Sequence, residues 1–475
     1  ADAVQTLSLP PEESSYQPPK DTDTSETHQP EPAELLALVT LSECLALLGA
    51  SCAVSDGSHT TPLVLNDTRL YLRRFWRYEQ CIAEGIRQRL TLPSSLADPE
   101  SGPARTPSRA LDQRFQSSEA VDYQKLACAL AARNRFAVIT GGPGTGKTTT
   151  VVNLLAALQA VAGESPDRAG RKYRIRLAAP TGKAAARLNE SIGGAVSRLP
   201  LADLPGNVEL ADIPTRVTTL HRLLGSRPDT RRFRHNRDNP LLVDILVIDE
   251  ASMVDVDLMA SVFDALPANA QLILLGDKDQ LASVDAGAVL GELCQRAFQA
   301  HYTPQTAQWL ATMTGSRLPE SLVDESGHPL DQAVAMLRKS YRFREDSGIR
   351  AFAEAVNTNA LDRAMVRRIR EAAFDDVILL SSPSGKPDPE DTLELVCRHA
   401  ITGSPEAFRN AGQGRQVNEK PLPPPVGYRH YLEQLQNHDL DENSSRGDWD
   451  AMAVQLLEAF SDFQVLCALR KGPWG

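Results

Sequence analysis

The residues of this chain best suited to chemistry form a glycine-rich loop, G-G-P-G-T-G-K-T, between Gly141 and Thr148. An apolar run, residues 136–139, precedes the loop, and apolar residues at helical spacing follow it. Glycines allow backbone N–H groups to surround an anion, Lys147 can reach the β- and γ-phosphates, and Thr148 can ligate Mg²⁺. The alternative, a turn that only starts a helix, explains less of this context. We therefore predict an ATP-binding P-loop that contains Gly142, Pro143, Gly144, Thr145, Gly146, Lys147, Thr148 and Thr149.

Two adjacent acids, Asp249 and Glu250, follow a second apolar run, residues 244–248. In P-loop hydrolases one such acid holds Mg²⁺ and the other activates the attacking water. Paired acids at a strand end are common, so the pair is informative only because a P-loop precedes it. We predict Thr148 and Asp249 as metal ligands and Glu250 as the catalytic base.

Three further side chains are candidates on chemical grounds. Gln280 lies past a later strand, where it could contact the γ-phosphate, and Arg342 could act as an arginine finger. Gln124 could hydrogen-bond both N6 and N7 of adenine. Each also has a plain alternative. Gln280, like Asp277, could be a helix N-cap or turn residue, Arg342 is one of 50 basic residues, and Gln124 could be a solvated helix residue.

The elements that must position these residues alternate between helix and strand from Tyr123 onward, which predicts a parallel α/β sheet. Functional residues collect at the carboxyl ends of such strands. We therefore expect one site where four strands end: residues 136–139, 174–178, 244–248 and 271–275.

Composition limits the possible functions. The 475 residues suggest about three domains. With a net charge of −11, the chain as a whole would repel a polyanion, so any nucleic-acid contact requires a local basic groove. The seven cysteines lack the spacing of a zinc site or a disulfide framework. The apolar run at residues 35–54 is interrupted by Glu43, so it does not predict a membrane span. The first residues do not resemble a signal peptide. We expect a cytoplasmic protein without membrane contact.

The pattern along the chain predicts five segments. Residues 1–33 form a disordered tail. Residues 34–90 form a small domain with strands at 63–67 and 69–72, a helix at 75–90, and a core of Leu70, Leu72, Phe75, Trp76, Ile82 and Ile86. Residues 91–118 are a proline-rich linker, and residues 119–340 are the α/β domain. In the last segment, 341–475, we expect helices at 349–356 and ending near 460, linkers at 382–391 and 420–428, and a strand at 465–469.

The order of several motifs resembles motifs I to IV of superfamily 1B DNA helicases. Besides the P-loop, these are L-A-A-P-T-G-K-A-A-A-R-L, T-L-H-R-L-L-G, I-D-E-A-S-M-V-D, L-L-G-D-K-D-Q-L and K-S-Y-R-F, and the match is strongest from Tyr123 to Phe343. The resemblance implies a RecA-like first domain at 119–340, a second beginning near Tyr341, and ATP-driven movement 5′ to 3′ on single-stranded DNA. It further implies a motor subunit of a heterotrimeric helicase–nuclease that repairs double-strand breaks, acts on duplex ends, and docks to partners through its N-terminal domain.

The same resemblance assigns roles to single residues. Gln124 would read adenine, Gln280 would couple hydrolysis to movement, and Arg342 would be an arginine finger. Other residues match positions along the DNA strand: Pro180, Thr181, Thr219 and His221. Judged alone, His221 is slightly more typical of a packing residue at a helix start.

Two later helicase motifs are missing from the sequence. Segments of the T-V-H-K-S-Q-G and T-R-A-R types do not occur after Arg342. We therefore expect an incomplete second RecA-like domain, which would stabilise the transition state weakly. The chain could be a fragment, a product of gene decay, or a sequence lacking its C-terminal part. Its function could then be that of a non-translocating, ATP-binding assembly subunit. A small-molecule kinase and a nuclease centre explain fewer motifs.

Overall fold

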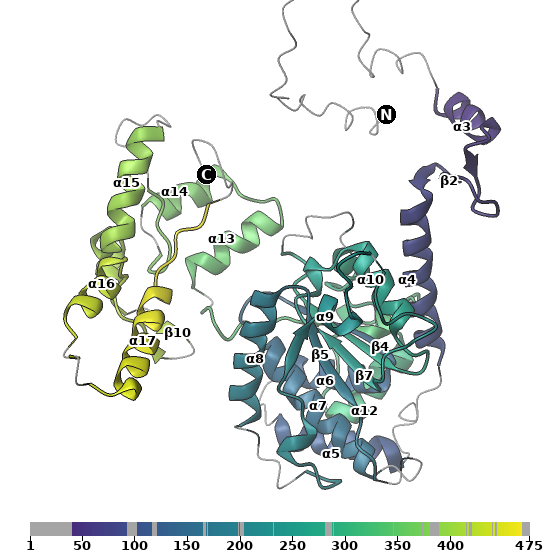
Figure 1. Ribbon diagram of the computed structural model, residues 1–475, viewed down its shortest axis with the longest axis horizontal. Coiled ribbons are helices and arrows are strands. Elements are labelled where there is room, and N and C mark those ends of the chain that lie inside the picture. The colour runs from purple at the N-terminus through teal and green to yellow at the C-terminus, as the bar shows by residue number, and fades with distance from the viewer. Residues whose placement is uncertain are drawn as a thin grey trace, which may run out of the picture.

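The computed structural model describes most of the chain between Thr40 and Cys467 (Figure 1). The described residues are 40–92, 102–115, 121–164, 168, 170–197, 199, 204–230, 232–280, 287, 289–344, 346–371, 374–380, 389–414, 416–417, 420–438, 440–441 and 444–467. The predicted disordered tail, residues 1–33, lies outside them.

A six-stranded parallel sheet, in the order β6-β5-β7-β8-β4-β9, forms the centre of the fold. Every residue of three inner strands, β4, β7 and β8, is buried, as expected for strands covered on both faces. The strands predicted from continuous apolar runs are confirmed to within one or two residues. The strands are β4 (Phe136–Gly141), β5 (Ile175–Ala179), β6 (Val217–Thr219), β7 (Ile245–Ile248), β8 (Gln271–Gly276) and β9 (Val334–Leu337).

Successive side chains of β4, β7 and β8 enter two different hydrophobic cores, because side chains alternate across a sheet. In β4, Ala137 and Ile139 enter one core, and Phe136 and Val138 enter the other. Helices that pack in the first core are α5 (Gly102–Arg114), α6 (Tyr123–Arg133), α7 (Lys147–Glu164), α8 (Gly182–Val196) and α12 (Pro304–Thr314). Helices that pack in the second are α4 (Arg73–Thr91), α9 (Leu220–Leu224), α10 (Val256–Ala265) and α11 (Val289–Leu293).

The segment before α4 consists of α3 (Leu41–Ala50) and a three-stranded sheet of β1 (Val54–Ser55), β2 (Leu63–Asn66) and β3 (Arg69–Leu72). The predicted pair of strands around an Asn-Asp turn is confirmed, with Asp67 at a φ of 53°. The predicted separate core is partly wrong. Leu70 and Leu72 are exposed, whereas Ile82 and Ile86 of α4 are buried in the second core of the α/β domain.

The predicted linker over residues 91–118 is wrong where α5 forms. Ala110 and Leu111 are fully buried in the first core, and Ser108 donates to the carbonyl of Met313 over 3.2 Å. Pro107 lies inside α5 and removes one helical hydrogen bond. Burial of a leucine contributes about 1.5–3 kcal/mol, which is enough to offset much of that loss. The prolines misled the prediction because sequence alone does not show burial.

The part after β9 contains five helices and one short hairpin among the residues that the structure describes. They are α13 (Gly348–Asn357), α14 (Arg363–Arg370), α15 (Pro389–Thr402), α16 (Arg429–Gln436) and α17 (Arg446–Ser461), with β10 (Gln416–Val417) antiparallel to β11 (Lys420–Pro421). Short 3-10 helices lie before β9, at η2 (Leu210–Asp212), η3 (Ala251–Met253), η4 (Glu320–Leu322) and η5 (Asp331–Ala333), and after it, at η6 (Pro405–Ala407) and η7 (Arg409–Gly412).

Some predictions for this last part are confirmed and others are wrong. The helices at 349–356 and ending near 460 are confirmed as α13 and α17. The strand at 465–469 is wrong for residues 465–467, which are irregular and exposed, and residues 468–469 lie outside the described residues. The predicted linker at 382–391 is wrong at 389–391, where α15 begins, and its residues 382–388 lie outside the described residues. The predicted linker at 420–428 is wrong at 420–421, which form β11, whereas residues 422–427 are irregular. Within the described ranges, no helix is long and apolar enough to cross a bilayer.

Candidate nucleotide site

The glycine-rich loop joins the carboxyl end of β4 to the first turn of α7. Gly144 and Gly146 have φ angles of 76° and 81°, in the left-handed region that favours glycine. A Cβ atom at Gly146 would lie 2.2 Å from Nε2 of Gln124, and one at Gly144 would lie 2.2 Å from Cβ of Arg342. The loop therefore needs glycine at both positions, for its backbone conformation and for the side chains packed against it.

Lys147 is half-buried beneath this loop. Its Nζ donates to the carbonyls of Gly141, over 2.7 Å, and Gly142, over 3.3 Å. An ammonium has three donors, so the group retains capacity for an anion in the loop. Thr148 is half-buried and Thr149 exposed on the same first turn, while the buried Thr145 closes the loop by donating to the Gly142 carbonyl over 2.9 Å.

Asp249 and Glu250 lie at the carboxyl end of β7, two strands from the loop in the sheet order. Burial raises the pKa of the Asp249 carboxyl to about 6, and the nearby Glu250 charge adds to the rise. The charges of Lys147 and Arg187 oppose the shift, which indicates that both cations are close enough to act on the carboxylate. These positions form one electrostatic site.

Glu250 has two unusual features. Its φ of 51° is left-handed, and its Oε2 is buried without a hydrogen-bond partner among the described residues. A buried carboxylate oxygen without a donor is costly and calls for a water or an ion that satisfies it. The geometry therefore suits an acid that holds a water molecule.

Gln124 and the segment that contains Arg342 contact the glycine-rich loop from two sides. The Gln124 amide donates to the carbonyl of Thr145 over 3.0 Å. Tyr341 N–H donates to the carbonyl of Gly144 over 2.8 Å, and Ser340 Oγ donates to the carbonyl of Pro143 over 3.2 Å. Sequence reasoning considered only the arginine of K-S-Y-R-F and missed Ser340 and Tyr341, whose presence in that same motif was the available signal.

Gln280 lies in an exposed turn that follows β8. Its N–H donates to the carbonyl of the buried Asp277 over 3.2 Å, and the N–H of Lys278 donates to Thr140 Oγ1 over 3.1 Å. Because Thr140 belongs to β4, the turn is fixed at the same sheet edge as the loop. The structure thus brings the backbone of Gln280 to this edge, with its side chain exposed.

The four residues predicted along a DNA strand follow the neighbouring strands β5 and β6. Pro180 is buried, and Thr181 caps α8 by accepting from the N–H of Ala184 over 3.2 Å. Thr219 caps α9 in the same way, with the N–H of Arg222 at 3.3 Å. His221 is exposed, and its ring centroid lies 5.8 Å from that of Phe233. These residues share the sheet edge that carries the nucleotide site.

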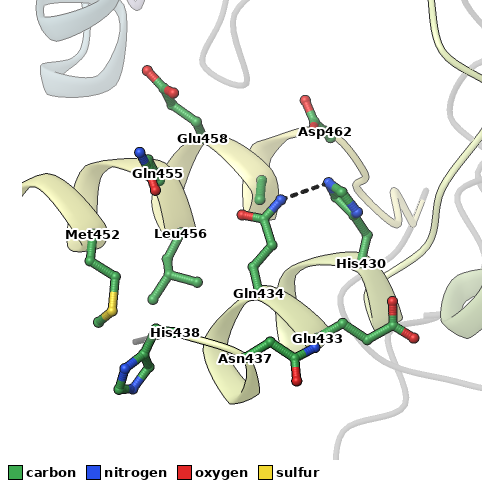
Figure 2. A pocket seen from close by; sticks show the side chains of 11 residues that line it. His430, Glu433, Gln434, Asn437, His438, Met452, Gln455, Leu456, Glu458 and Asp462 are labelled. Carbon is green, nitrogen blue, oxygen red and sulfur yellow. Dashed lines mark hydrogen bonds between the residues drawn. The ribbon is translucent and has the colours of Figure 1, made fainter. Parts of the chain in front are cut away.

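A separate hollow of about 620 Å³ lies between α16 and α17. Figure 2 shows its lining side chains, including His430, which is joined to Gln434 over 3.0 Å. Despite two histidines and several acids in the lining, the described residues contain no group of three or more such side chains that could hold a metal ion. The hollow belongs to the part after β9 and contains none of the predicted site residues.

Comparison with known proteins gives consistent matches. Residues 124–286 match the model of an AAA domain, and residues 8–71 match that of the RecBCD enzyme subunit RecD, N-terminal domain. RecBCD enzyme subunit RecD of Haemophilus influenzae is 39% identical over 432 residues, which are 90% of this chain and 61% of that protein. The ATP-dependent RecD2 DNA helicase of Deinococcus radiodurans is 34% identical over 48% of this chain and 26% of its own length.

A solved structure of Pif1 helicase from Bacteroides with ADP-AlF3 and single-stranded DNA matches 59% of this chain and 57% of its own, with 17% identity and a TM-score of 0.30.

The parallel sheet and the glycine-rich loop at its carboxyl edge define a P-loop nucleotide-binding protein. The two family matches and the relatives above show that the chain is similar to RecD proteins over most of its length. The chain spans about three fifths of the length of the Haemophilus relative.

Proposed function

We propose that this chain is an ATP-dependent DNA helicase and translocase subunit of a RecBCD-type helicase–nuclease, exodeoxyribonuclease V. It would move 5′ to 3′ on single-stranded DNA in double-strand break repair and recombination. The observation that carries the proposal is the electrostatic site formed by Lys147 beneath the glycine-rich loop and the Asp249–Glu250 pair. Motors of this class need a phosphate cradle and an acid pair at one sheet edge.

The proposed chemistry follows from the residues present. The loop N–H groups and Lys147 hold the β- and γ-phosphates, and Thr148 and Asp249 hold Mg²⁺. When bound, the metal ion neutralises charge on the phosphates. Glu250 takes a proton from the attacking water, a role that suits its buried Oε2 without a protein donor. Gln124 binds adenine, Arg342 contributes charge at the γ-phosphate, and Gln280 links hydrolysis to movement.

The proposed partners are single-stranded and duplex-end DNA together with RecB-type and RecC-type subunits in a heterotrimer. Pro180, Thr181, Thr219 and His221 would line the DNA strand. The segment 34–90 would dock to a partner, residues 119–340 would be the first RecA-like motor domain, and residues 341–475 would begin the second. The compartment would be the cytoplasm.

A second candidate is an assembly subunit that binds ATP without translocating. One observation favours it: after β9, the described residues contain helices and a two-stranded hairpin but no second parallel sheet.

Steady-state ATP hydrolysis with and without single-stranded DNA distinguishes the two candidates. We expect the chain, alone or with RecB-type and RecC-type subunits, to show DNA-stimulated turnover that Lys147→Gln abolishes. Arg135→Gln is a matched control, because Arg135 lies just before the opposite end of β4. Nucleotide binding without turnover under every condition would favour the assembly subunit, and normal turnover in Lys147→Gln would contradict the site itself.

A further inference from the structure

A groove of about 620 Å³ opens between the start of α4, the start of α10 and the loop that follows α9. Figure 1 shows α4 running from β2 alongside α10. Three arginines and three rings line the groove: Arg74 and Phe75 from α4, and His221, Arg227, Arg232 and Phe233 from α9 and its following loop. Of these, only His221 belongs to a helicase motif.

The wall formed by the loop after α9 is held by backbone hydrogen bonds. Gly225 ends α9 with a φ of 74°, and the N–H groups of Arg234 and His235 return to the carbonyls of Gly225 and Leu224, each over 2.9 Å. These two hydrogen bonds fold the chain back on itself, so that the ring of Phe233 lies edge-on to that of His221. Two side chains that could contact a base are therefore positioned before any ligand binds.

The opposite wall is the start of α4, and this helix is held both at its start and farther along its length. At its start, the Arg73 guanidinium donates to Ser55 Oγ over 2.9 Å and to Thr61 Oγ1 over 3.0 Å. Farther along, a Cβ at Gly85 would lie 2.3 Å from Cδ1 of Phe263, so α4 and α10 approach closely at this glycine. Arg74 and Phe75 are thus carried by a helix fixed against the α/β domain.

The charges of the groove favour an anion. The guanidinium groups of Arg74, Arg227 and Arg232 have neither an ion pair nor a side-chain hydrogen bond within the described part of the chain, and Arg74 lies 4.7 Å from the ring centroid of Phe75. Two carboxylates also face the groove, and Asp255 caps α10 by accepting from the N–H of Leu258 over 2.7 Å. Asp257 is the other, so cations outnumber anions in a chain whose net charge is −11.

We infer that this groove binds a single strand of nucleic acid, and that α4 of the N-terminal segment takes part in DNA binding. Bases would stack on Phe75, Phe233 and His221, and phosphates would pair with the three arginines. A groove that combines aromatic rings with cations is typical of proteins that bind single strands. The inference rests on the proposed function, and it adds a DNA-contacting wall that the helicase motifs do not contain.

Fluorescence anisotropy of the full chain with labelled oligo(dT), at low salt and without nucleotide, tests the inference. We expect the double variants Arg74→Ala/Phe75→Leu and Arg227→Ala/Arg232→Ala each to bind at least about tenfold more weakly, since a stacked base or a lost phosphate contact changes affinity severalfold. Arg87→Ala is the control, because Arg87 is exposed on the same helix, pairs with Glu84 and does not line the groove. Circular dichroism monitors folding.

The outcomes distinguish a failure of the groove inference from a failure of the proposed function. Wild-type binding to oligo(dT) with undiminished binding by both double variants would overturn the groove and leave the proposed function intact. No binding by the wild-type chain, alone or with its partner subunits, would overturn both. A single Phe75→Leu variant adds a further test: it should weaken binding to oligo(dT) but not to an abasic strand of equal length, and equal losses on both would remove stacking from the inference.

Discussion

The backbone N–H of Tyr341 donates to the carbonyl of Gly144 over 2.8 Å, so the segment that leaves β9 is joined directly to the glycine-rich loop. Ser340 adds a second bond, to the carbonyl of Pro143. Arg342 comes next in the chain, and its position is therefore tied to the conformation of the loop. A change in the loop on nucleotide binding would be passed to Arg342 through two hydrogen bonds and no intervening element.

Gly144→Ala should uncouple these segments. The variant places a side chain at a φ of 76° and 2.2 Å from Cβ of Arg342. We expect the free energy of unfolding to fall by about 1–2 kcal/mol in the absence of nucleotide, measured by urea denaturation. Gly142→Ala is the matched control, because nothing lies within 4 Å of a Cβ there. Equal losses in the two variants would show that the contact with Arg342 has no energetic role.

Glu250→Gln should separate binding from hydrolysis. An amide has nearly the size of the carboxylate but cannot accept the proton of water, so we expect turnover to fall by about 10²–10⁴-fold. Nucleotide affinity, measured by equilibrium titration, should change little. Glu190→Gln on the exposed side of α8 serves as the control. Hydrolysis at the normal rate in a single-turnover experiment would rule out Glu250 as the base.

The stability of the nucleotide-free protein should depend on pH through Asp249. Burial raises the pKa of this carboxyl from its ordinary value of 3.8 to about 6 in the folded state. Between these two values the folded state binds the proton more tightly than the unfolded chain does, so the free energy of unfolding falls as pH rises from about 4 to about 6. Above about pH 6 the free energy of unfolding no longer changes through this carboxyl.

Asp249→Asn should remove this dependence, because the amide does not titrate. At pH 7 and without Mg²⁺, we expect the variant to be more stable than the wild type by about 2–3 kcal/mol, while it loses metal-dependent hydrolysis. Urea denaturation at several pH values measures the difference. Parallel pH profiles for the two proteins would contradict the assigned pKa.

Arg89→Ala should weaken the attachment of α4. Arg89 is 2% exposed, and its guanidinium donates to the carbonyls of Leu266, Pro267 and Ala270 over 2.8–3.3 Å. Burial lowers the pKa of this guanidinium to about 10. Removing the guanidinium leaves these carbonyls without that donor, two of them in buried hydrogen bonds, so we expect a loss of about 3 kcal/mol. The neighbouring Arg87→Ala should change stability by less than about 0.5 kcal/mol, because its ion pair with Glu84 is exposed. Thermal denaturation followed by circular dichroism compares the two.

The centre of the fold was predictable because its strands are buried on both faces. Such strands appear in the sequence as continuous apolar runs, as in residues 271–275, and the chemistry-bearing residues follow them directly. The convergence of Lys147 and Asp249 at one edge then follows from parallel strand direction. The contacts of Ser340 and Tyr341 with the loop were missed, although both residues belong to K-S-Y-R-F, because the Ser340 hydroxyl and the Tyr341 N–H bind backbone carbonyls that any residue could supply.

Other features depended on long-range burial that local sequence does not encode. Pro103 and Pro107 indicated a linker, but Leu111 packs into a core formed mostly by residues far along the chain. Ile82 and Ile86 likewise pack with α10 and not with their own N-terminal segment. Val465 and Leu466 have strand composition, yet the described part of the chain offers them no sheet to join.

Helix α4 connects the small sheet to the α/β domain as one rigid element. Its 19 residues form a rod about 28 Å long, clamped by Arg73 to the small sheet at one end and by Arg89 to the α/β domain at the other. A protein that binds the small sheet is therefore connected through α4 to the α/β domain. The contact between Gly85 and Phe263 joins α4 to α10, and α10 begins six residues after Glu250.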